Sequence, residues 1–151
     1  MGIVNKHSGT INGAFDEWID DIQCGDRLRQ GFFFEEDENY ETLQEDKYAN
    51  EFIFNLFKFI AIGGHMNQFE NKISEFLECT KDLYKDLIAV GKDPTTQEIK
   101  PRSVVFRIDN VTCPSNAKAV FGEHPQNFLY VLVDQANWHC TVFSNKWSRK
   151  W

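Results

Sequence analysis

The strongest hydrophobic pattern in the chain lies in residues 48–90, and it predicts two helices. Residues 48–63 are apolar on nearly every side, which is typical of a helix that is buried over most of its surface. Residues 68–90 carry apolar positions at helical spacing on one stripe and charges on the other, which predicts an amphipathic helix. Gly63 and Gly64 separate the two, because glycine readily adopts the left-handed conformation that ends a helix. The segment therefore predicts a helical hairpin.

The pattern changes to strand-like alternation after residue 100. Side chains of residues 103–111 alternate between a mainly apolar and a more polar face, which predicts a strand with one face exposed to solvent. Val104 and Phe106 lie on the face that is expected to be covered. Residues 127–133 are apolar without interruption and predict a central strand. A polar turn separates them from residues 138–143, which predict the returning strand of a hairpin.

Helices followed by strands indicate an α+β fold, with the helical hairpin packed on a small antiparallel sheet. A length of 151 residues is typical of one domain, so we expect a single domain over residues 1–151. Within it, residues 1–47 are expected to be acidic and partly irregular. The spacing of Phe15, Trp18, Ile19 and Ile22 predicts a short helix there, and Phe32–Phe34 predict a short buried strand.

Charge is distributed unevenly along the chain, whose net charge is -7. From Asp16 to Glu51 there are 13 acidic residues and three basic ones, so this segment carries -10. An acidic chain has no electrostatic attraction to phosphate backbones, which argues against nucleic acid as a partner. The run Glu35, Glu36, Asp37 and Glu38 is either a solvated loop or a docking patch for a basic partner.

The last eight residues, 144–151, form a basic tail that contains Trp147 and Trp151. Tryptophan is enriched at the energetic centres of protein interfaces, so the tail is a candidate binding element. Alternatively, one or both rings fold back over the sheet. Both interpretations stay open at the level of sequence.

Candidate chemistry is sparse. The four cysteines lie far apart, and neither metal-ligand spacing nor a phosphate-binding loop is present, so no catalytic, cofactor or metal site is expected. Asp134, His139 and Cys140 lie close in sequence and leave open a small cytoplasmic enzyme or ligand-binding domain. Adjacent strand residues point to opposite faces, however, so His139 and Cys140 cannot easily meet. A buried structural cysteine is therefore expected at position 140.

The location of the protein follows from two further patterns. The longest apolar stretch, residues 52–64, is interrupted by polar residues and is shorter than the roughly 18 residues that a membrane-spanning helix needs. The amino-terminal residues lack the pattern of a secretory signal. We therefore expect no membrane association and a reducing, cytoplasmic setting with free thiols.

The order and spacing of many short segments resemble the cilia- and flagella-associated protein 300 family. The resemblance covers nearly the whole chain. The matching residues are Ser8-Gly9, Asp26–Arg29, Glu51-Phe52, Phe57-Lys58, Gly63-Gly64, Leu83–Leu87, Pro94, Gln97, Ile99, Ser103-Val104, Cys113–Ser115 and Phe128–Asp134. Members of this family are longer, with a region that precedes the part matched here, so we expect this chain to be a short form or a fragment.

The resemblance implies a non-enzymatic factor in the assembly or transport of axonemal dynein arms. It implies protein partners, namely dynein assembly factors of the PIH co-chaperone class and the ciliary transport machinery. It also implies a location in the cytoplasm and in the axoneme of motile cilia or flagella. The family has no established catalytic residues, so none is assigned to this chain.

Overall fold

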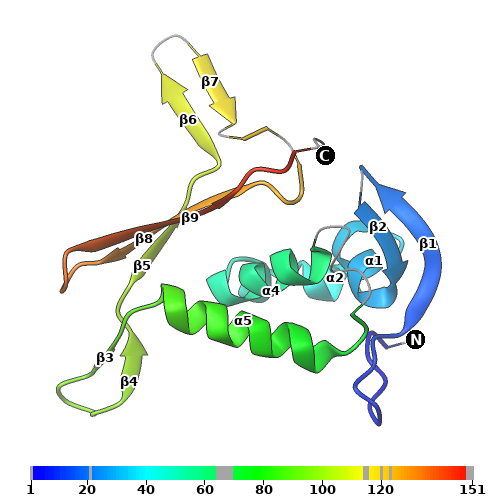
Figure 1. Ribbon diagram of the computed structural model, residues 1–151, viewed down its shortest axis with the longest axis horizontal. Coiled ribbons are helices and arrows are strands. Elements are labelled where there is room, and N and C mark those ends of the chain that lie inside the picture. The colour runs from blue at the N-terminus through cyan, green and yellow to red at the C-terminus, as the bar shows by residue number, and fades with distance from the viewer. Residues whose placement is uncertain are drawn as a thin grey trace. The chain divides into compact units, whose positions relative to one another are not determined.

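The computed structural model describes residues 2–20, 22–63, 70–113, 116–119, 121–122 and 124–148, with the backbone alone over 111–113 and 116–119. The chain divides into two compact units, Met1–Tyr84 and Lys85–Trp151 (Figure 1). Helices dominate the first unit and antiparallel strands the second, so the predicted α+β class is confirmed. The expectation of a single domain stays a prediction.

The amino-terminal unit begins with a hairpin of two strands, β1 (Gly13–Ile19) and β2 (Ile22–Asp26). The predicted helix over residues 14–22 is therefore wrong. The pairing of β1 with β2 is irregular between Gly13 and Glu17, and such an irregularity breaks the alternation that identifies a strand. The resulting apolar spacing imitates a helix, although Phe15 is 93% exposed and Trp18 is 58% exposed.

Helix α1 (Arg27–Phe33) follows directly and lies at the centre of this unit. Asp26 caps it by accepting a hydrogen bond of 2.8 Å from the backbone N–H of Arg29. The strand predicted for Phe32–Phe34 is wrong, because Phe32 and Phe33 complete this helix and Phe34 caps its end.

Gly31 lies inside α1 and allows it to pack closely on α2 (Tyr40–Leu43). A Cβ atom on Gly31 would lie 2.9 Å from the side chain of Leu43 and 3.3 Å from that of Asn39. The glycine is therefore a contact residue inside the helix.

The two long helices are confirmed, with shorter bounds than predicted: α4 spans Phe52–Ile62 and α5 spans Ile73–Leu87. Residues Asp46–Ala49 form a separate turn, α3, and Glu51 is extended, so α4 starts later than residue 48. Gly63 ends α4 with a φ of 55°, as its sequence position predicts. The expected start of the second helix, near residue 68, lies outside the described residues. No described helix is long and apolar enough to cross a membrane.

The core of the amino-terminal unit joins β2, α1, α4 and α5. Phe32 is 2% exposed, and its ring meets the rings of Phe54 and Phe57 edge-on at centroid distances of 6.0 and 6.1 Å. The buried members of the core cluster are Ile11, Ile22, Cys24, Leu28, Phe32, Ala61, Ile62 and Phe76. The many phenylalanines of the sequence thus supply the packing centre of this unit.

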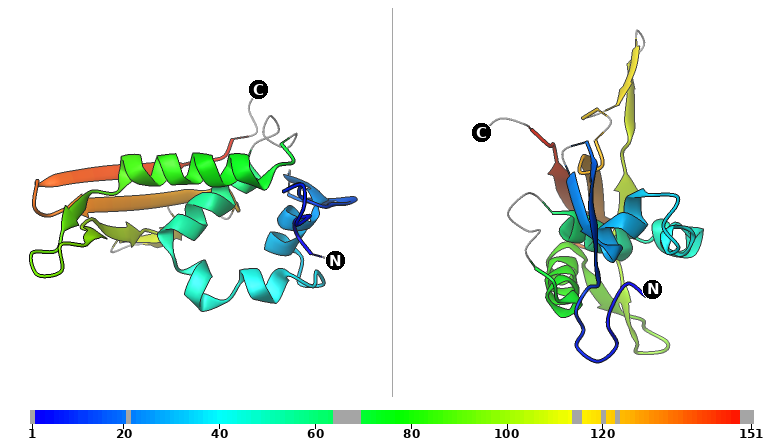
Figure 2. Two further views of the ribbon diagram at one scale, coloured as in Figure 1. Left: turned by 90° about the horizontal axis from the view of Figure 1, so that it is seen from below. Right: turned by 90° about the vertical axis from the view of Figure 1, so that its right-hand side faces the viewer.

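The carboxy-terminal unit contains a three-stranded antiparallel sheet with the order β5-β8-β9. Its strands are β5 (Val104–Arg107), β8 (Phe128–Asp134) and β9 (His139–Asn145), which confirms the predicted central strand and hairpin. β8 and β9 pair along all seven residues and run side by side in the left view of Figure 2.

Two small hairpins accompany this sheet. They are β3 (Val90–Lys92) with β4 (Ile99–Pro101), and β6 (Asn110–Cys113) with β7 (Asn116–Ala119). The sequence pattern does not predict the β3–β4 hairpin. β6 begins at the end of the predicted strand 103–111, and β7 lies beyond it. The predicted strand 103–111 is thus divided between β5 and β6.

Candidate functional site

The acidic run after α1 is an ordered turn rather than a loose loop. Glu35, Glu36 and Glu38 are exposed, whereas Asp37 points inward and is 9% exposed. The Asp37 carboxylate accepts hydrogen bonds from the Arg27 guanidinium at 3.0 Å and from the backbone and side-chain nitrogens of Asn39 at 2.9 and 2.8 Å. Asp37 therefore holds the turn in place, and the three glutamates carry its outward charge.

These contacts change the titration of Asp37. Burial alone would raise the pKa of this carboxyl group. The hydrogen bonds from Asn39 and the charge and hydrogen bond of Arg27 outweigh that effect, so the pKa lies below its ordinary value. The carboxylate is thus charged at neutral pH and stabilises the folded state.

Asp37→Asn is expected to lower the free energy of unfolding by about 2 kcal/mol at pH 7, because the Arg27 and Asn39 donors lose a charged acceptor. The folded-state pKa is depressed, so this contribution is complete above the unfolded-state pKa of about 4 and disappears as the pH falls through the folded-state pKa. Urea denaturation at pH 7 and at a series of acidic pH values measures it. Glu36→Gln, at an exposed carboxylate of the same turn, is the control and should change little. If the stability difference between the wild type and Asp37→Asn did not shrink in acid, the charge of the Asp37 carboxylate would not be its cause.

The first tryptophan of the tail packs against the loop that precedes β8. The Trp147 ring stacks on the His124 ring at a centroid distance of 4.4 Å and an interplanar angle of 18°. Its backbone N–H donates to the side-chain oxygen of Asn127 at 2.7 Å. Trp147 is half-buried, so part of its ring is open to solvent, while Trp151 lies outside the described residues. Partner binding by either ring stays a prediction.

His139 and Cys140 are both exposed on the edge strand β9. The prediction of a buried Cys140 is wrong, because β9 borders the sheet on one side and its Cys140 face is open. The register pairs His139 with Asp134 and Cys140 with Val133, so the two side chains lie on opposite faces of the sheet. They do not form a nucleophile and base pair.

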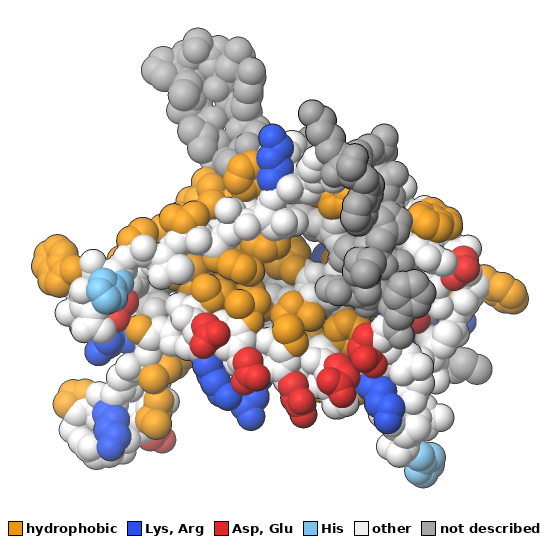
Figure 3. Space-filling model, viewed as in Figure 1, with side chains coloured by type: hydrophobic (Ala, Val, Ile, Leu, Met, Phe, Trp, Pro, Cys, Tyr) orange, Lys and Arg blue, Asp and Glu red, His pale blue; other side chains and the backbone are white. Residues whose placement is uncertain are grey.

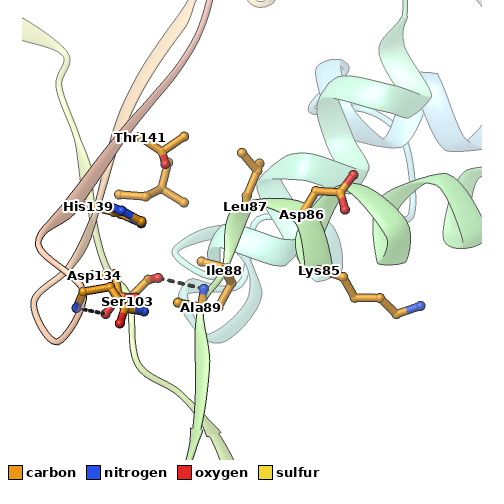
Figure 4. Close-up of a pocket in the computed structure, with 11 residues that line it drawn as sticks. Lys85, Asp86, Leu87, Ile88, Ala89, Ser103, Asp134, His139 and Thr141 are labelled. Carbon is orange, nitrogen blue, oxygen red and sulfur yellow. Dashed lines mark hydrogen bonds between the residues drawn. The ribbon is translucent and has the colours of Figure 1, made fainter.

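A polar hollow of about 260 Å³ lies beside His139 (Figure 4). Its lining includes Asp134, Ser103, Thr141 and the end of α5 at Lys85–Leu87. Within it, the Ser103 hydroxyl accepts a hydrogen bond of 2.9 Å from the backbone N–H of Ala89. The hollow is open, and its most buried polar group is Asp134.

Asp134 is fully engaged in structural contacts. Its carboxylate accepts from the Arg102 guanidinium at 3.0 Å, from the Asn137 side chain at 2.7 Å and from the backbone N–H of Ala136 at 3.1 Å. Burial would raise the pKa of Asp134, but these donors outweigh it and keep that pKa below its ordinary value. Asp134 therefore anchors the hairpin turn through contacts with Arg102, Ala136 and Asn137.

The fold also alters the titration of the Cys24 thiol, which is buried in the core of the amino-terminal unit. Burial, with the Asp26 carboxylate as a second cause, raises the pKa of the Cys24 thiol to about 12, so this thiol stays protonated at neutral pH. Among the described residues, no three His, Cys, Asp or Glu side chains converge closely enough to hold a metal ion.

Sequence patterns missed the largest exposed apolar groups of the sheet. The side of β5 that was expected to be dry is the open one, since Val104 is 41% exposed and Phe106 is 50% exposed. Trp138, in the β8–β9 turn, is 92% exposed and has a φ of 57°. Its position in a polar turn was the available signal, because a bulky residue rarely occurs there without a role.

Comparison of the sequence with known proteins relates residues 1–145 to one family. The family model for cilia- and flagella-associated protein 300 matches residues 1–145. A Paramecium tetraurelia protein of that name is 30% identical over 143 residues, which cover 95% of this chain and 54% of the relative. A Chlamydomonas reinhardtii protein of the same name is 30% identical over 130 residues, which cover 85% of this chain and 50% of the relative.

No solved structure matches the chain significantly. The chain spans about half the length of the curated relatives that it matches. The match nevertheless includes both structural units, from the amino-terminal hairpin to the end of β9. The chain therefore belongs to the cilia- and flagella-associated protein 300 family.

Proposed function

We propose that this chain acts in the assembly or transport of axonemal dynein arms, by binding other proteins and without catalysing a reaction. The observation that carries the proposal is the family match over residues 1–145. The proposed partners are dynein assembly factors of the PIH co-chaperone class and the ciliary transport machinery. The proposed places of action are the cytoplasm and the motile cilium or flagellum.

The turn after α1 supports a role in binding. Glu35, Glu36 and Glu38 are exposed on a turn that Asp37 and Arg27 hold in one conformation. A rigid arrangement of like charges favours a partner of opposite charge, and it lowers the conformational cost of the encounter. The proposed contact at this turn is a basic segment of an assembly factor.

The role in the cell is tested by removing the gene in a ciliated cell and counting dynein arms in axoneme cross-sections by electron microscopy. We expect missing arms and reduced beating, both restored when the wild-type gene is returned. Arms and beating that persist without the protein would overturn the proposal.

The proposed contact is tested with the double variant Glu35→Gln/Glu36→Gln in quantitative co-precipitation with the assembly factors. We expect binding to fall about tenfold and to depend on salt, because exposed charge pairs are screened by ions. Glu75→Gln/Glu78→Gln, at two exposed carboxylates of α5, is the matched control and should retain binding. Equal binding by both double variants would exclude the turn as the contact.

Quantitative co-precipitation of a chain that lacks residues 147–151 tests whether the tail binds a partner. Trp147 stacks on His124, so this truncation is expected to lower the melting temperature. If stability falls and partner binding does not, the tail is a structural element and its proposed role in docking is excluded.

A further inference from the structure

Strand β1 is the outer strand of the amino-terminal hairpin (Figure 1). Five of its seven residues are exposed, whereas every residue of β2 is buried or half-buried. Within the described part of the chain, β1 and β2 form a sheet of two strands, and no third strand pairs with β1. The outer edge of β1 therefore presents backbone N–H and C=O groups on which a further strand can form.

The register shows which backbone groups face outward. Ile19 pairs with Ile22, and two residues separate them in the sequence, so their backbone groups bond across the hairpin. The direction of these groups alternates along an antiparallel strand, so the N–H and C=O of Trp18 point away from β2. The Trp18 side chain is 58% exposed. One residue thus offers both an outward backbone edge and an open aromatic surface.

Two carboxylates precede this ring on β1. Asp16 and Glu17 are both exposed. A Cβ atom on Gly25 would lie 2.5 Å from the Asp16 carboxylate, so this carboxylate lies over Gly25, on the face that Gln23 shares with Trp18. Figure 3 shows acidic and hydrophobic side chains next to each other in the region where Figure 1 draws β1. An indole ring and a carboxylate on one face of a strand are both attractive to a cation.

The cations of this unit do not neutralise the β1 carboxylates. Its two arginines pair with other carboxylates, Arg27 with Asp37 and Arg29 with Asp26. Among the residues that the structure describes, no basic side chain pairs with either carboxylate of β1. Both carboxylates therefore keep their attraction for a cationic partner.

We propose that the outer edge of β1 binds an extended, arginine- or lysine-containing segment of a partner protein as a third strand of the hairpin. Main-chain hydrogen bonds to Trp18 hold the segment. Its basic side chains stack on the indole ring and pair with the Asp16 carboxylate. The same carboxylates disfavour a second copy of β1 at this edge, because like charges on adjacent strands repel.

Charge on an edge strand also protects it against unwanted pairing. Protection alone does not account for the exposed rings of this strand, since Phe15 is 93% and Trp18 is 58% exposed. Aromatic rings are enriched at binding surfaces, and carboxylates beside them select the sign of the partner's charge. The inference adds a second contact to the proposed function and rests on it only in naming a protein as the partner. Its test uses synthetic peptides, so it can fail while the role in the cell stands.

Isothermal titration calorimetry of the intact chain tests the proposal with a peptide of four Arg-Val repeats, blocked at both ends. We expect this peptide to bind about tenfold more tightly than a peptide of four Ser-Val repeats, and to bind more weakly as salt is added. A Glu-Val peptide should not bind. No binding of the Arg-Val peptide, or equal binding of the Ser-Val peptide, would overturn the proposal, the second because it would indicate an uncharged partner.

A matched pair of charge variants locates the binding. Asp16→Asn/Glu17→Gln should lower the affinity for the Arg-Val peptide about tenfold, because it removes both carboxylates of the strand. Glu35→Gln/Glu36→Gln removes the same amount of charge from the turn after α1 and should retain most of the affinity. Equal losses for the two variants would mean that the peptide responds only to net charge, and would overturn the proposal.

The ring is tested in the same way. Trp18→Ala should lower the affinity severalfold, because it removes the aromatic surface on which a guanidinium stacks. Trp138→Ala is the control, since that ring is 92% exposed and belongs to the other structural unit. A loss for Trp138→Ala with none for Trp18→Ala would place the peptide elsewhere.

Hydrogen exchange on the wild-type chain gives a measurement that needs no variant. The outward amide of Trp18 should exchange severalfold more slowly when the Arg-Val peptide is bound, because it then donates to the added strand. The amide of Ile19 already bonds across the hairpin, so it should change less. An exchange rate for the Trp18 amide that the peptide leaves unchanged would exclude strand addition at this edge, even if the peptide binds.

Discussion

Replacing Phe32 by alanine is expected to destabilise the amino-terminal unit by about 3–5 kcal/mol, the largest effect of any single substitution considered for this chain. The ring is 2% exposed and makes edge contacts with Phe54 and Phe57. Its removal loses the transfer free energy of the ring and leaves a cavity that α1 and α4 cannot fill without moving. A loss of this size is a large part of the stability of a typical domain.

Urea denaturation followed by circular dichroism measures this effect. Phe15→Ala is the matched control, because it makes the same chemical change at a ring that is 93% exposed. Its stability change should stay within about 0.5 kcal/mol. If the two variants were equally stable, Phe32 would not be a core residue and the arrangement of α1 against α4 would be wrong.

Leu132→Ala is expected to destabilise the carboxy-terminal unit by about 2–5 kcal/mol. Leu132 lies at the middle of the central strand and is 2% exposed. Because β8 pairs with both β5 and β9, a cavity beneath it weakens both ladders.

Val142→Ala, at an exposed side chain of the neighbouring strand β9, is the control for Leu132→Ala. It should change the free energy of unfolding by less than about 1 kcal/mol, because the side chain is 62% exposed. Thermal and urea denaturation measure both variants. If they lowered the free energy of unfolding equally, Leu132 and Val142 would be equally buried and the assignment of a covered and an exposed side to this sheet would be wrong.

The elements that sequence predicted correctly are those with a long and regular pattern. The uninterrupted apolar run 127–133, the polar turn after it and the returning segment 138–143 predict β8 and β9 to within two residues. The apolar stripe of α5 extends over four turns, so single exceptions do not obscure it. Gly63 marks the end of α4 because its backbone requires a positive φ.

The errors arise where tertiary contacts override local pattern. An irregular pairing with β2 gave β1 the apolar spacing of a helix. The exposure of Phe106 and Cys140 could not be predicted, since an apolar residue on a strand indicates a covered face and nothing in the pattern identifies which layer covers it. Likewise, the inward direction of Asp37 depends on Arg27, ten residues earlier.

Gln30 connects α1 to both strands of the amino-terminal hairpin. It is 6% exposed, and its side-chain nitrogen donates to the backbone oxygens of Phe15 at 2.6 Å and of Cys24 at 2.9 Å, one on each strand of the β1–β2 hairpin. A two-stranded hairpin is marginally stable by itself, and this one has an irregular register. The hairpin therefore depends for its stability on the packing of α1, and one Gln30 side chain holds both of its strands to that helix.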